Sequence, residues 1–147
     1  TSCARREARH HDQGARLGMY VADVMLTVAK QFDYVVIGGN SGIHQFCKID
    51  SYSMIGGASL ILKDVPAYVM VSGNPAHAFA MNIEGMRRKG WSKNVIQGLR
   101  DAFKLIYKSG LTTEEAIQKI RAEILPEVPE AQRLIDSLEQ SKRGIVR

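Results

Sequence analysis

Basic side chains in the second half of the chain are the residues whose spacing most clearly indicates binding chemistry. Seven positive side chains lie between Arg87 and Lys108, against a single acid, Asp101. The seven are Arg87, Arg88, Lys89, Lys93, Arg100, Lys104 and Lys108. After Leu111 the charges nearly balance, so the net charge of +5 is unevenly placed. Such a local positive field favours an anionic partner, which is a phosphate, a nucleic acid or an acidic protein.

The histidines and cysteines predict no metal site. The four histidines are His10, His11, His44 and His77. Their spacing does not match that of zinc ligands, and Cys3 and Cys47 match no metal-binding spacing. Nothing indicates an oxidising compartment, so we expect no structural disulfide. A histidine outside any motif, such as His77, is expected to have a structural role.

An isoleucine recurs every six positions in the middle of the chain. The series is Ile37, Ile43, Ile49, Ile55 and Ile61. Four residues after each comes a small or medium-sized residue, in the order Ser41, Cys47, Ser53, Ser59 and Val65. The second and third places of two hexads hold Gly38, Gly39, Gly56 and Gly57. This period is typical of a parallel β-helix built from hexapeptides, with aliphatic residues inside, small residues where the walls converge and glycine at the corners. The alternative is an ordinary sheet with coincidental spacing.

Five hexads make fewer than two three-sided coils. Stacked repeats bury their interior only against neighbours, and about three are needed for stability. We therefore expect further coils from the N-terminal segment or support from another chain. Residues 1–34 supply coils poorly, because the first sixteen carry four arginines and two histidines without an aliphatic period. We expect a solvated lead-in there, and a chain that starts at Thr1 rather than methionine is expected to be a fragment or a processed product.

A helix is predicted between Ser92, a plausible N-cap, and Gly110. Its apolar stripe consists of Val95, Leu99, Phe103 and Ile106. Arg100, Lys104 and Lys108 are spaced by four and share another face, beside Lys93. This row is either a solvated surface or a docking patch, and the basic residues just upstream favour docking.

Two further helices are predicted after this one. Thr112 and Glu115 form a capping box, followed by a helix that ends at Pro126. Pro129 at a first-turn position predicts a last helix that ends near Gly144. Between the hexads and the helices, residues 65–75 are expected to be extended chain with turns.

No stretch approaches the roughly 18 apolar residues that a membrane-spanning helix needs. The nearest candidate, residues 17–29, is interrupted by Asp23 and is not followed by a cleavage pattern for a signal peptide. With 45% apolar and 24% charged residues, the chain has the composition of a soluble globular protein. We therefore expect a cytoplasmic protein without an integral membrane segment.

Several short runs closely resemble the UDP-N-acetylglucosamine O-acyltransferases. They are Ile37–Cys47 (IGGNSGIHQFC), Asp64–Tyr68 (DVPAY), Gly73–Ala76 (GNPA), Asn82–Gly90 (NIEGMRRKG) and Ser141–Arg147 (SKRGIVR). The His-Gln-Phe-Cys and Asn-Ile-Glu-Gly elements are specific in this order. The resemblance covers residues 35–147, about three quarters of the chain.

The resemblance implies a left-handed parallel β-helix followed by a C-terminal α-helical domain, assembled as a homotrimer with active sites between subunits. It divides the chain into an atypical lead-in over 1–34, hexapeptide coils with their exit segment over 35–75, and a helical domain over 76–147. Handedness comes from the resemblance alone, since periodicity does not determine it.

The implied reaction transfers a 3-hydroxyacyl chain from acyl carrier protein to the 3-hydroxyl of UDP-N-acetylglucosamine, the first step of lipid A biosynthesis. No metal or dissociable cofactor takes part, because phosphopantetheine arrives on the carrier protein. The acidic carrier protein would bind the basic residues Arg87, Lys93, Arg100, Lys104 and Lys108. Nucleic acid is not expected, because no interleaved aromatic platform accompanies these charges.

The resemblance also implies roles for individual residues. The base that takes the proton from the sugar hydroxyl is a histidine in this family, and a histidine pKa near operating pH suits that role. The family's catalytic motif is not recognisable here, nor is a second, glycine-preceded histidine, and His11 with Asp12 is the nearest candidate for the base. His44 matches a histidine that lines the cleft. The residues matching the UDP-sugar site are Asn82, Glu84 and Arg88, with Lys89 in place of a second basic residue.

Gly57 matches the position that floors the acyl groove of the family. Because glycine leaves room for a longer chain, we expect a 3-hydroxyacyl donor of about 12 to 14 carbons. Three alternatives remain open. The chain could be a noncatalytic trimerisation and carrier-binding module without its base, or another hexapeptide acyltransferase, such as the N-acyltransferase of the same pathway or a small acetyltransferase. A zinc-dependent carbonic anhydrase of related architecture is the third.

Overall fold

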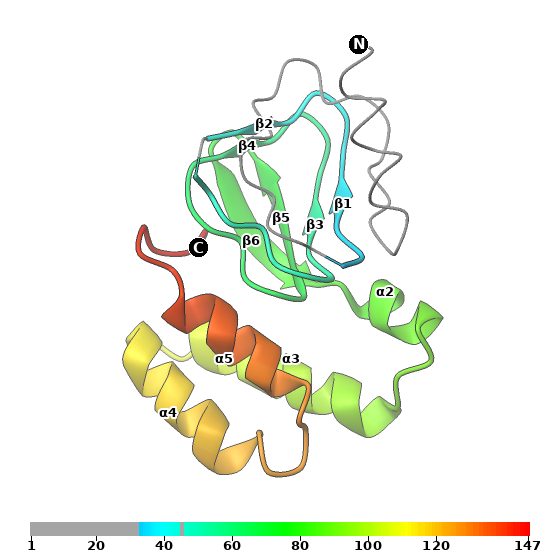
Figure 1. Ribbon diagram of the computed structural model, residues 1–147, viewed down its shortest axis with the longest axis vertical. Coiled ribbons are helices and arrows are strands. Elements are labelled where there is room, and N and C mark those ends of the chain that lie inside the picture. The colour runs from blue at the N-terminus through cyan, green and yellow to red at the C-terminus, as the bar shows by residue number, and fades with distance from the viewer. Residues whose placement is uncertain (1–32, 45) are drawn as a thin grey trace.

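The computed structural model describes residues 33–44 and 46–147 of the chain (Figure 1). The expectations for residues 1–32, including the role of His11, lie outside the described residues. Strands occupy the first part of the described chain, and four helices follow them in sequence order. In Figure 1 the strands lie above and the helices α3, α4 and α5 lie together below.

The strands form the walls of a three-sided parallel coil. Four are only two residues long: β1 (Val36–Ile37), β2 (Gly42–Ile43), β3 (Met54–Ile55) and β4 (Leu60–Ile61). Strand β1 pairs in parallel with β3, β2 pairs with β4, and a parallel bridge between Ile49 and Val65 marks the third wall. Equivalent positions such as Ser41 and Ser59 are 18 residues apart, which is three hexads per coil.

Two longer strands end the stack. Strand β5 (Val69–Gly73) pairs in parallel with β3, and β6 (Ala76–Met81) pairs antiparallel with β5. One wall therefore has the strand order β1-β3-β5-β6. This last coil is shorter, since Lys48 and Asp64 occupy adjacent coils 16 residues apart. The segment expected to be extended chain with turns thus contains one strand and the turn into the next.

The six-residue period describes the interior correctly. Ile55 and Ile61 are fully buried, and Ile37 and Ile49 nearly so, whereas Ile43 is half-buried. The small residues four places later are all buried: Ser41, Cys47, Ser53, Ser59 and Val65. Three of them are serines that would lose hydrogen bonds with water, and their hydroxyls bond instead to the coil backbone, as Ser41 Oγ does by donating to the Gly56 carbonyl at 3.0 Å.

Glycine lies in two of the corner turns, at Gly39 and Gly57, but the left-handed conformation at these corners falls on the residue that follows it. A positive φ recurs every six residues, at Tyr34, Asn40, Phe46, Tyr52 and Ala58. None of these is glycine, so the coil imposes the left-handed conformation on ordinary side chains at some cost in strain. Gly38 is required for a different reason. A Cβ at this position would lie 2.4 Å from the Gly57 nitrogen of the next coil, so glycine permits close stacking of the backbones.

Four helices follow the strands: α2 (Ile83–Arg88), α3 (Lys93–Tyr107), α4 (Thr113–Glu123) and α5 (Ala131–Glu139). Ser92 caps α3, and the capping box of Thr112 and Glu115 begins α4, as predicted. The prediction for the last helix was imprecise, because Pro129 precedes its N-cap and the helix ends at Glu139. Helix α2 was not predicted, since six residues are too few to show a period. Over the described residues, no helix is both long and apolar enough to cross a membrane.

Residues 140–147, which we term the C-terminal segment, return from α5 to the coils (Figure 1). Asp64, only 4% exposed, is the main anchor. Its carboxylate accepts hydrogen bonds from the backbone nitrogen of Lys48 at 2.8 Å and from Ser141 Oγ at 2.7 Å. Its backbone forms a parallel bridge with Ile145. The far end is held as well, because His77 Nδ1 lies 2.8 Å from the Arg147 carbonyl oxygen. His77 thus has the structural contact expected for it.

Candidate functional site

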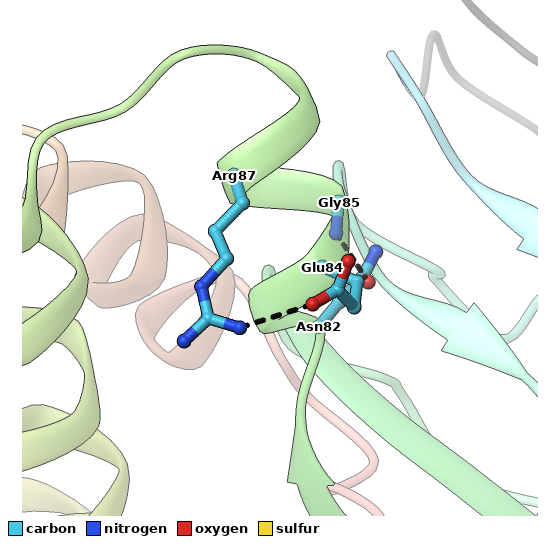
Figure 2. A network of polar contacts seen from close by, with 4 residues as sticks. All are labelled: Asn82, Glu84, Gly85 and Arg87. Carbon is cyan, nitrogen blue, oxygen red and sulfur yellow. Dashed lines mark hydrogen bonds and ion pairs between the residues drawn. The ribbon is translucent and has the colours of Figure 1, made fainter.

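Asn82 fixes the start of α2 to the coil. Its Oδ1 accepts a hydrogen bond from the Gly85 nitrogen at 3.0 Å, which caps the helix, and its Nδ2 donates to the Tyr52 carbonyl at 2.9 Å. Figure 2 shows the side chain turned toward Gly85 at the beginning of the helix. A Cβ on Gly85 would lie 2.5 Å from Asn82 Nδ2, so this glycine leaves room for the cap. The amide therefore has a clear structural function here.

Glu84 and Arg87 form an ion pair on the exposed side of α2. Arg87 Nη1 donates to Glu84 Oε1 at 3.0 Å, and Figure 2 shows the arginine side chain reaching back along the helix to the carboxylate. Glu84 was expected in the UDP-sugar site and Arg87 in carrier docking, so two predicted roles fall on one pair. Both side chains are more than half exposed, and such a pair exchanges readily for another partner.

A tyrosine ladder runs down one corner of the coil beside α2. The ring centroids of Tyr34 and Tyr52 are 5.0 Å apart, and those of Tyr52 and Tyr68 are 5.6 Å apart. Trp91, just after α2, packs against both Tyr52 and Tyr68. Lys89 Nζ lies 3.2 Å from the centroid of Tyr34, a cation–π contact. The ladder thus places the Lys89 ammonium against the coil at the end of α2.

Tyr68, at the interior end of this ladder, keeps its hydroxyl proton at neutral pH and does not serve as a general base. Tyr68 is 1% exposed, and burial raises the pKa of its hydroxyl far above the usual range. That hydroxyl donates to the Glu130 carbonyl at 2.9 Å and so joins the coil to the N-terminus of α5. Burial also raises the pKa of Tyr52. The tyrosines therefore pack and position neighbouring groups.

His44 lies on a different wall, just after β2, and contacts the C-terminal segment. Its Nδ1 is 3.1 Å from Arg143 Nη1. Arg143 also acts on the neighbouring Cys47, whose thiol pKa is raised by burial and further by Asp64, with Arg143 opposing the increase. Within one chain, His44 is therefore tied to Arg143, whereas Asn82 is tied to Tyr52 at the tyrosine corner.

The basic row of α3 faces away from the core. Its buried residues are Ile96, Leu99, Ala102, Phe103 and Ile106. Lys93, Lys104 and Lys108 are exposed, and Arg100 is half-buried. Their spacing by about four residues places them on the side opposite the buried stripe. Over the part of the chain that the structure describes, no cluster of three His, Cys, Asp or Glu side chains is arranged to hold a metal ion.

Comparison with known proteins identifies the group to which this arrangement belongs. A family model described as UDP N-acetylglucosamine O-acyltransferase, domain 2, matches residues 64–146, more than half of the chain. The chain belongs to the UDP-N-acetylglucosamine O-acyltransferase family. The match begins at Asp64, which anchors the C-terminal segment, and includes α2 with its ion pair and cap.

Members of this family resemble the chain in sequence and in structure. The acyl-[acyl-carrier-protein]–UDP-N-acetylglucosamine O-acyltransferase of a Psychrobacter species is 62% identical over 89 residues, and that of Ectopseudomonas mendocina is 48% identical over 115. The solved LpxA of Acinetobacter baumannii is 83% identical over 78% of this chain with a TM-score of 0.77. The solved UDP-N-acetylglucosamine O-acyltransferase of Moraxella catarrhalis is 57% identical over the same share, with a TM-score of 0.76.

These similarities imply the left-handed β-helix fold of the UDP-N-acetylglucosamine O-acyltransferases for the matched part. The chain spans less than half the length of these relatives: 34% and 44% of the two curated enzymes, and 45% and 44% of the two solved chains. The hypothesis of a carbonic anhydrase is contradicted by the family membership, as is that of a small acetyltransferase.

Sequence reasoning missed two features of this part of the chain. The tyrosine ladder was overlooked because the fourth place of each hexad was not followed, although Tyr34 and Tyr52 stand one full coil apart. A search for aromatic residues at the coil period would have found them. Arg143 was noted only as part of the closing run, and no local pattern indicates that its partner is His44, 99 positions earlier.

Proposed function

We propose that the chain is the C-terminal part of an enzyme that transfers a 3-hydroxyacyl group from acyl carrier protein to the 3-hydroxyl of UDP-N-acetylglucosamine, the first step of lipid A biosynthesis. The observation that carries this proposal is the built contact between α2 and the coil, where Asn82 bonds to Tyr52 and Lys89 packs on Tyr34. The Asn-Ile-Glu-Gly motif is thus held in a fixed place next to the parallel coil. The relatives that match the chain are named O-acyltransferases.

Helix α2 and its neighbours provide the groups for the nucleotide-sugar. Arg88 and Lys89 are exposed at the end of the helix and offer positive charge to a diphosphate. The planar fork of Arg88 can donate to two phosphate oxygens, whereas Lys89 acts as a point charge. Glu84 can accept hydrogen bonds from sugar hydroxyls once its ion pair with Arg87 opens. Asn82 supports the site by fixing the helix.

The complete site would lie between subunits of a homotrimer. His44 and α2 are anchored at different walls of the coil. In a trimer, the wall that bears His44 in one subunit can therefore face the wall that bears α2 in the neighbouring subunit. Exposed apolar side chains on the coil and on β6, namely Phe46, Leu62 and Phe79, support such an association because an apolar surface gains from burial. The helices would then form the C-terminal helical domain of each subunit.

The basic row supplies a docking surface for the acyl carrier protein. Lys93, Lys104 and Lys108 project from α3 with Arg100 between them, and Arg87 lies just upstream. An acidic partner would be attracted to this field, and the attraction increases the rate of encounter. The thioester is already activated and its phosphopantetheine belongs to the carrier protein. The proposed transfer therefore needs no metal or cofactor held by this chain. Separately, we propose a cytoplasmic location for this reaction.

A general base is still required, and His11 is our proposal for it. The second candidate function is a trimerisation and carrier-binding module without a base, which is favoured because the family's catalytic motif is not recognisable in these 147 residues. The two functions differ in one measurement, which is acyl transfer by the 147-residue chain from 3-hydroxyacyl carrier protein to UDP-N-acetylglucosamine. Transfer by the chain and its loss in His11→Ala would support the enzyme with His11 as base.

Two controls make that assay decisive. His77→Ala removes a histidine that contacts the C-terminal segment and should leave transfer within a few-fold of the parent chain. Raising the salt concentration should raise the KM for the carrier protein, because screening weakens the attraction to the α3 row. A folded trimer that binds carrier protein but transfers nothing would contradict the enzyme and leave the binding module.

Gly57 is expected to set the length of the acyl chain. It is exposed, and a Cβ there would meet only the Gly39 carbonyl oxygen at 3.4 Å, so a side chain can be added without disturbing the coil. We expect Gly57→Met to shift the preferred donor from about 12 to 14 carbons toward shorter chains, with a loss of at least tenfold in kcat/KM for the longer chain. Competition between donors of different length measures the shift, and an unchanged preference would remove Gly57 from the groove.

A further inference from the structure

Lys89 meets the coil through the face of an aromatic ring rather than through an acid. Its Nζ lies over the Tyr34 ring, 3.2 Å from the centroid. The face of such a ring carries partial negative charge and attracts an ammonium group. Tyr34 is half-buried and Lys89 is exposed. The contact thus holds the cation at the surface of the coil, and it leaves the positive charge of Lys89 uncancelled, because the ring is neutral.

The coil fixes the position of the Tyr34 ring. Next to it in the chain, the Asp33 carbonyl accepts a hydrogen bond from the Tyr52 nitrogen at 3.0 Å, and the strand that follows, β1, pairs with β3. The ring itself stacks on Tyr52, with centroids 5.0 Å apart, and Tyr52 stacks in turn on the buried Tyr68. The ring therefore has its place independently of Lys89.

The end of α2 fixes the backbone of Lys89. The Lys89 nitrogen donates to the carbonyls of Gly85 and Met86, at 3.3 and 3.1 Å. The side chain of Met86 is fully buried, and its carbonyl also accepts from the Trp91 nitrogen at 3.2 Å. The ring of Trp91 packs against Tyr52, with centroids 5.0 Å apart. The cation–π contact therefore joins two side chains whose backbones are held separately.

We propose that Tyr34 is a positioning residue, whose ring holds the Lys89 ammonium in place for the diphosphate of the nucleotide-sugar. The inference rests on the proposed role of Lys89 in that site. A mobile lysine loses side-chain freedom when it binds a phosphate, and a lysine already held over a ring loses less. A carboxylate would also hold the lysine, but it would cancel the charge that the phosphates need. The acid of α2, Glu84, is bonded to Arg87 instead.

Proton–carbon NMR of the chain with 13C-labelled lysine tests the contact without a ligand. The ring current of an aromatic side chain shifts protons above its face upfield. We expect the ε-methylene protons of Lys89, assigned by their loss in Lys89→Met, to lie upfield of those of Lys119, an exposed lysine of α4 assigned in the same way. The shift should persist in Tyr34→Phe and disappear in Tyr34→Leu. Equal resonances of the two lysines in the parent chain would overturn the proposal.

Binding of UDP-N-acetylglucosamine, measured by calorimetry, tests the role of the contact. Tyr34→Leu should bind about threefold more weakly than the parent chain, as expected for one exposed cation–π contact, and Tyr34→Phe should restore the affinity. In a Lys89→Met background, Tyr34→Leu should have no further effect, because the ring then has no cation to hold. Lys119→Met, which removes the same charge from α4, should bind like the parent chain. The same threefold loss in the Lys89→Met background would show that Tyr34 acts only through the fold, and would overturn the proposal.

A further variant separates the charge of the ring face from the packing of the ring. Pentafluorophenylalanine in place of Tyr34 keeps a ring against Tyr52, but its fluorines withdraw electrons from the face that attracts the cation. It should bind the nucleotide-sugar as weakly as Tyr34→Leu, and binding equal to that of Tyr34→Phe would overturn the proposal. A parent chain that binds no nucleotide-sugar would overturn the proposed function together with this role. A parent chain that binds, but whose affinity is the same in every Tyr34 variant, would overturn the role of Tyr34 alone.

Discussion

Replacing Gly38 by alanine is expected to destabilise the chain by about 3 kcal/mol, since the added methyl overpacks two coils that are in backbone contact. The new Cβ would lie 2.4 Å from the Gly57 nitrogen, 2.7 Å from its Cα and 2.8 Å from the Gly56 carbonyl carbon. All three atoms belong to backbone that pairs with neighbouring coils. The strain therefore cannot be relieved by moving one flexible side chain, and the coils must separate.

Thermal unfolding followed by circular dichroism measures this effect, with an expected fall in Tm of about 6 to 12 °C for a chain of this length. Gly57→Ala is the matched control, because it adds the same methyl on the adjacent coil, where the nearest contact is an ordinary 3.4 Å. It should change stability by less than about 1 kcal/mol, as for a tolerated glycine-to-alanine change. Equal Tm values for the two variants would show that close stacking at Gly38 is not needed.

Asp64→Ala is also expected to lower the free energy of unfolding by about 3 kcal/mol, here through loss of polar contacts rather than through overpacking. The substitution removes the acceptor of the Lys48 nitrogen and of Ser141 Oγ and leaves a donor of the buried coil unsatisfied. The C-terminal segment would then lose its contacts with the buried carboxylate and keep the others, such as the bond from the Val146 nitrogen to the Asp64 carbonyl at 2.8 Å and that from Lys48 Nζ to the Gln140 carbonyl at 2.9 Å. We expect this segment to detach before the coils unfold.

Hydrogen exchange followed by mass spectrometry distinguishes detachment of the C-terminal segment from unfolding of the coils. Peptides from residues 140–147 should exchange faster in Asp64→Ala, while those containing β3 and β5 should change less. Asp101→Ala is the control, because Asp101 is an exposed carboxylate on α3 that accepts one hydrogen bond from Gln97 at 3.0 Å. Its removal should cost less than about 1 kcal/mol. Unchanged exchange of the segment would mean that Asp64 does not anchor it.

The coil interior could be predicted from sequence because it depends on a simple period. Each wall of the coil turns one aliphatic residue into the interior, so the isoleucines recur every six positions, and Ile55 and Ile61 are buried. The helix starts at Ser92 and Thr112 were also predictable, because a cap is a local interaction between residues three positions apart. Local and periodic signals therefore account for most of the fold that was predicted.

The corners and the site could not be predicted in this way. A positive φ at Tyr34 or Tyr52 contradicts the local preference of tyrosine and arises only because the coil closes on itself. The contact of Arg143 with His44 joins residues that no local rule relates. The motif residues of α2 were recognised by resemblance, but the structure adds that Asn82 caps the helix and that Glu84 pairs with Arg87. His11 and its role remain a prediction.

The C-terminal segment has a consequence for the order of events during synthesis. Its contacts reach back 77 positions from Ser141 to Asp64, 92 from Gln140 to Lys48 and 99 from Arg143 to His44. A ribosome releases the coils first, so these bonds cannot form until residues 140–147 have left the exit tunnel. Contacts between residues so distant in sequence also slow folding, because a large loop must close before they form. The coil surface around Lys48 and Asp64 would therefore stay uncovered while the helices are being synthesised. Chaperones that bind exposed strands could bind there until the C-terminal segment is made.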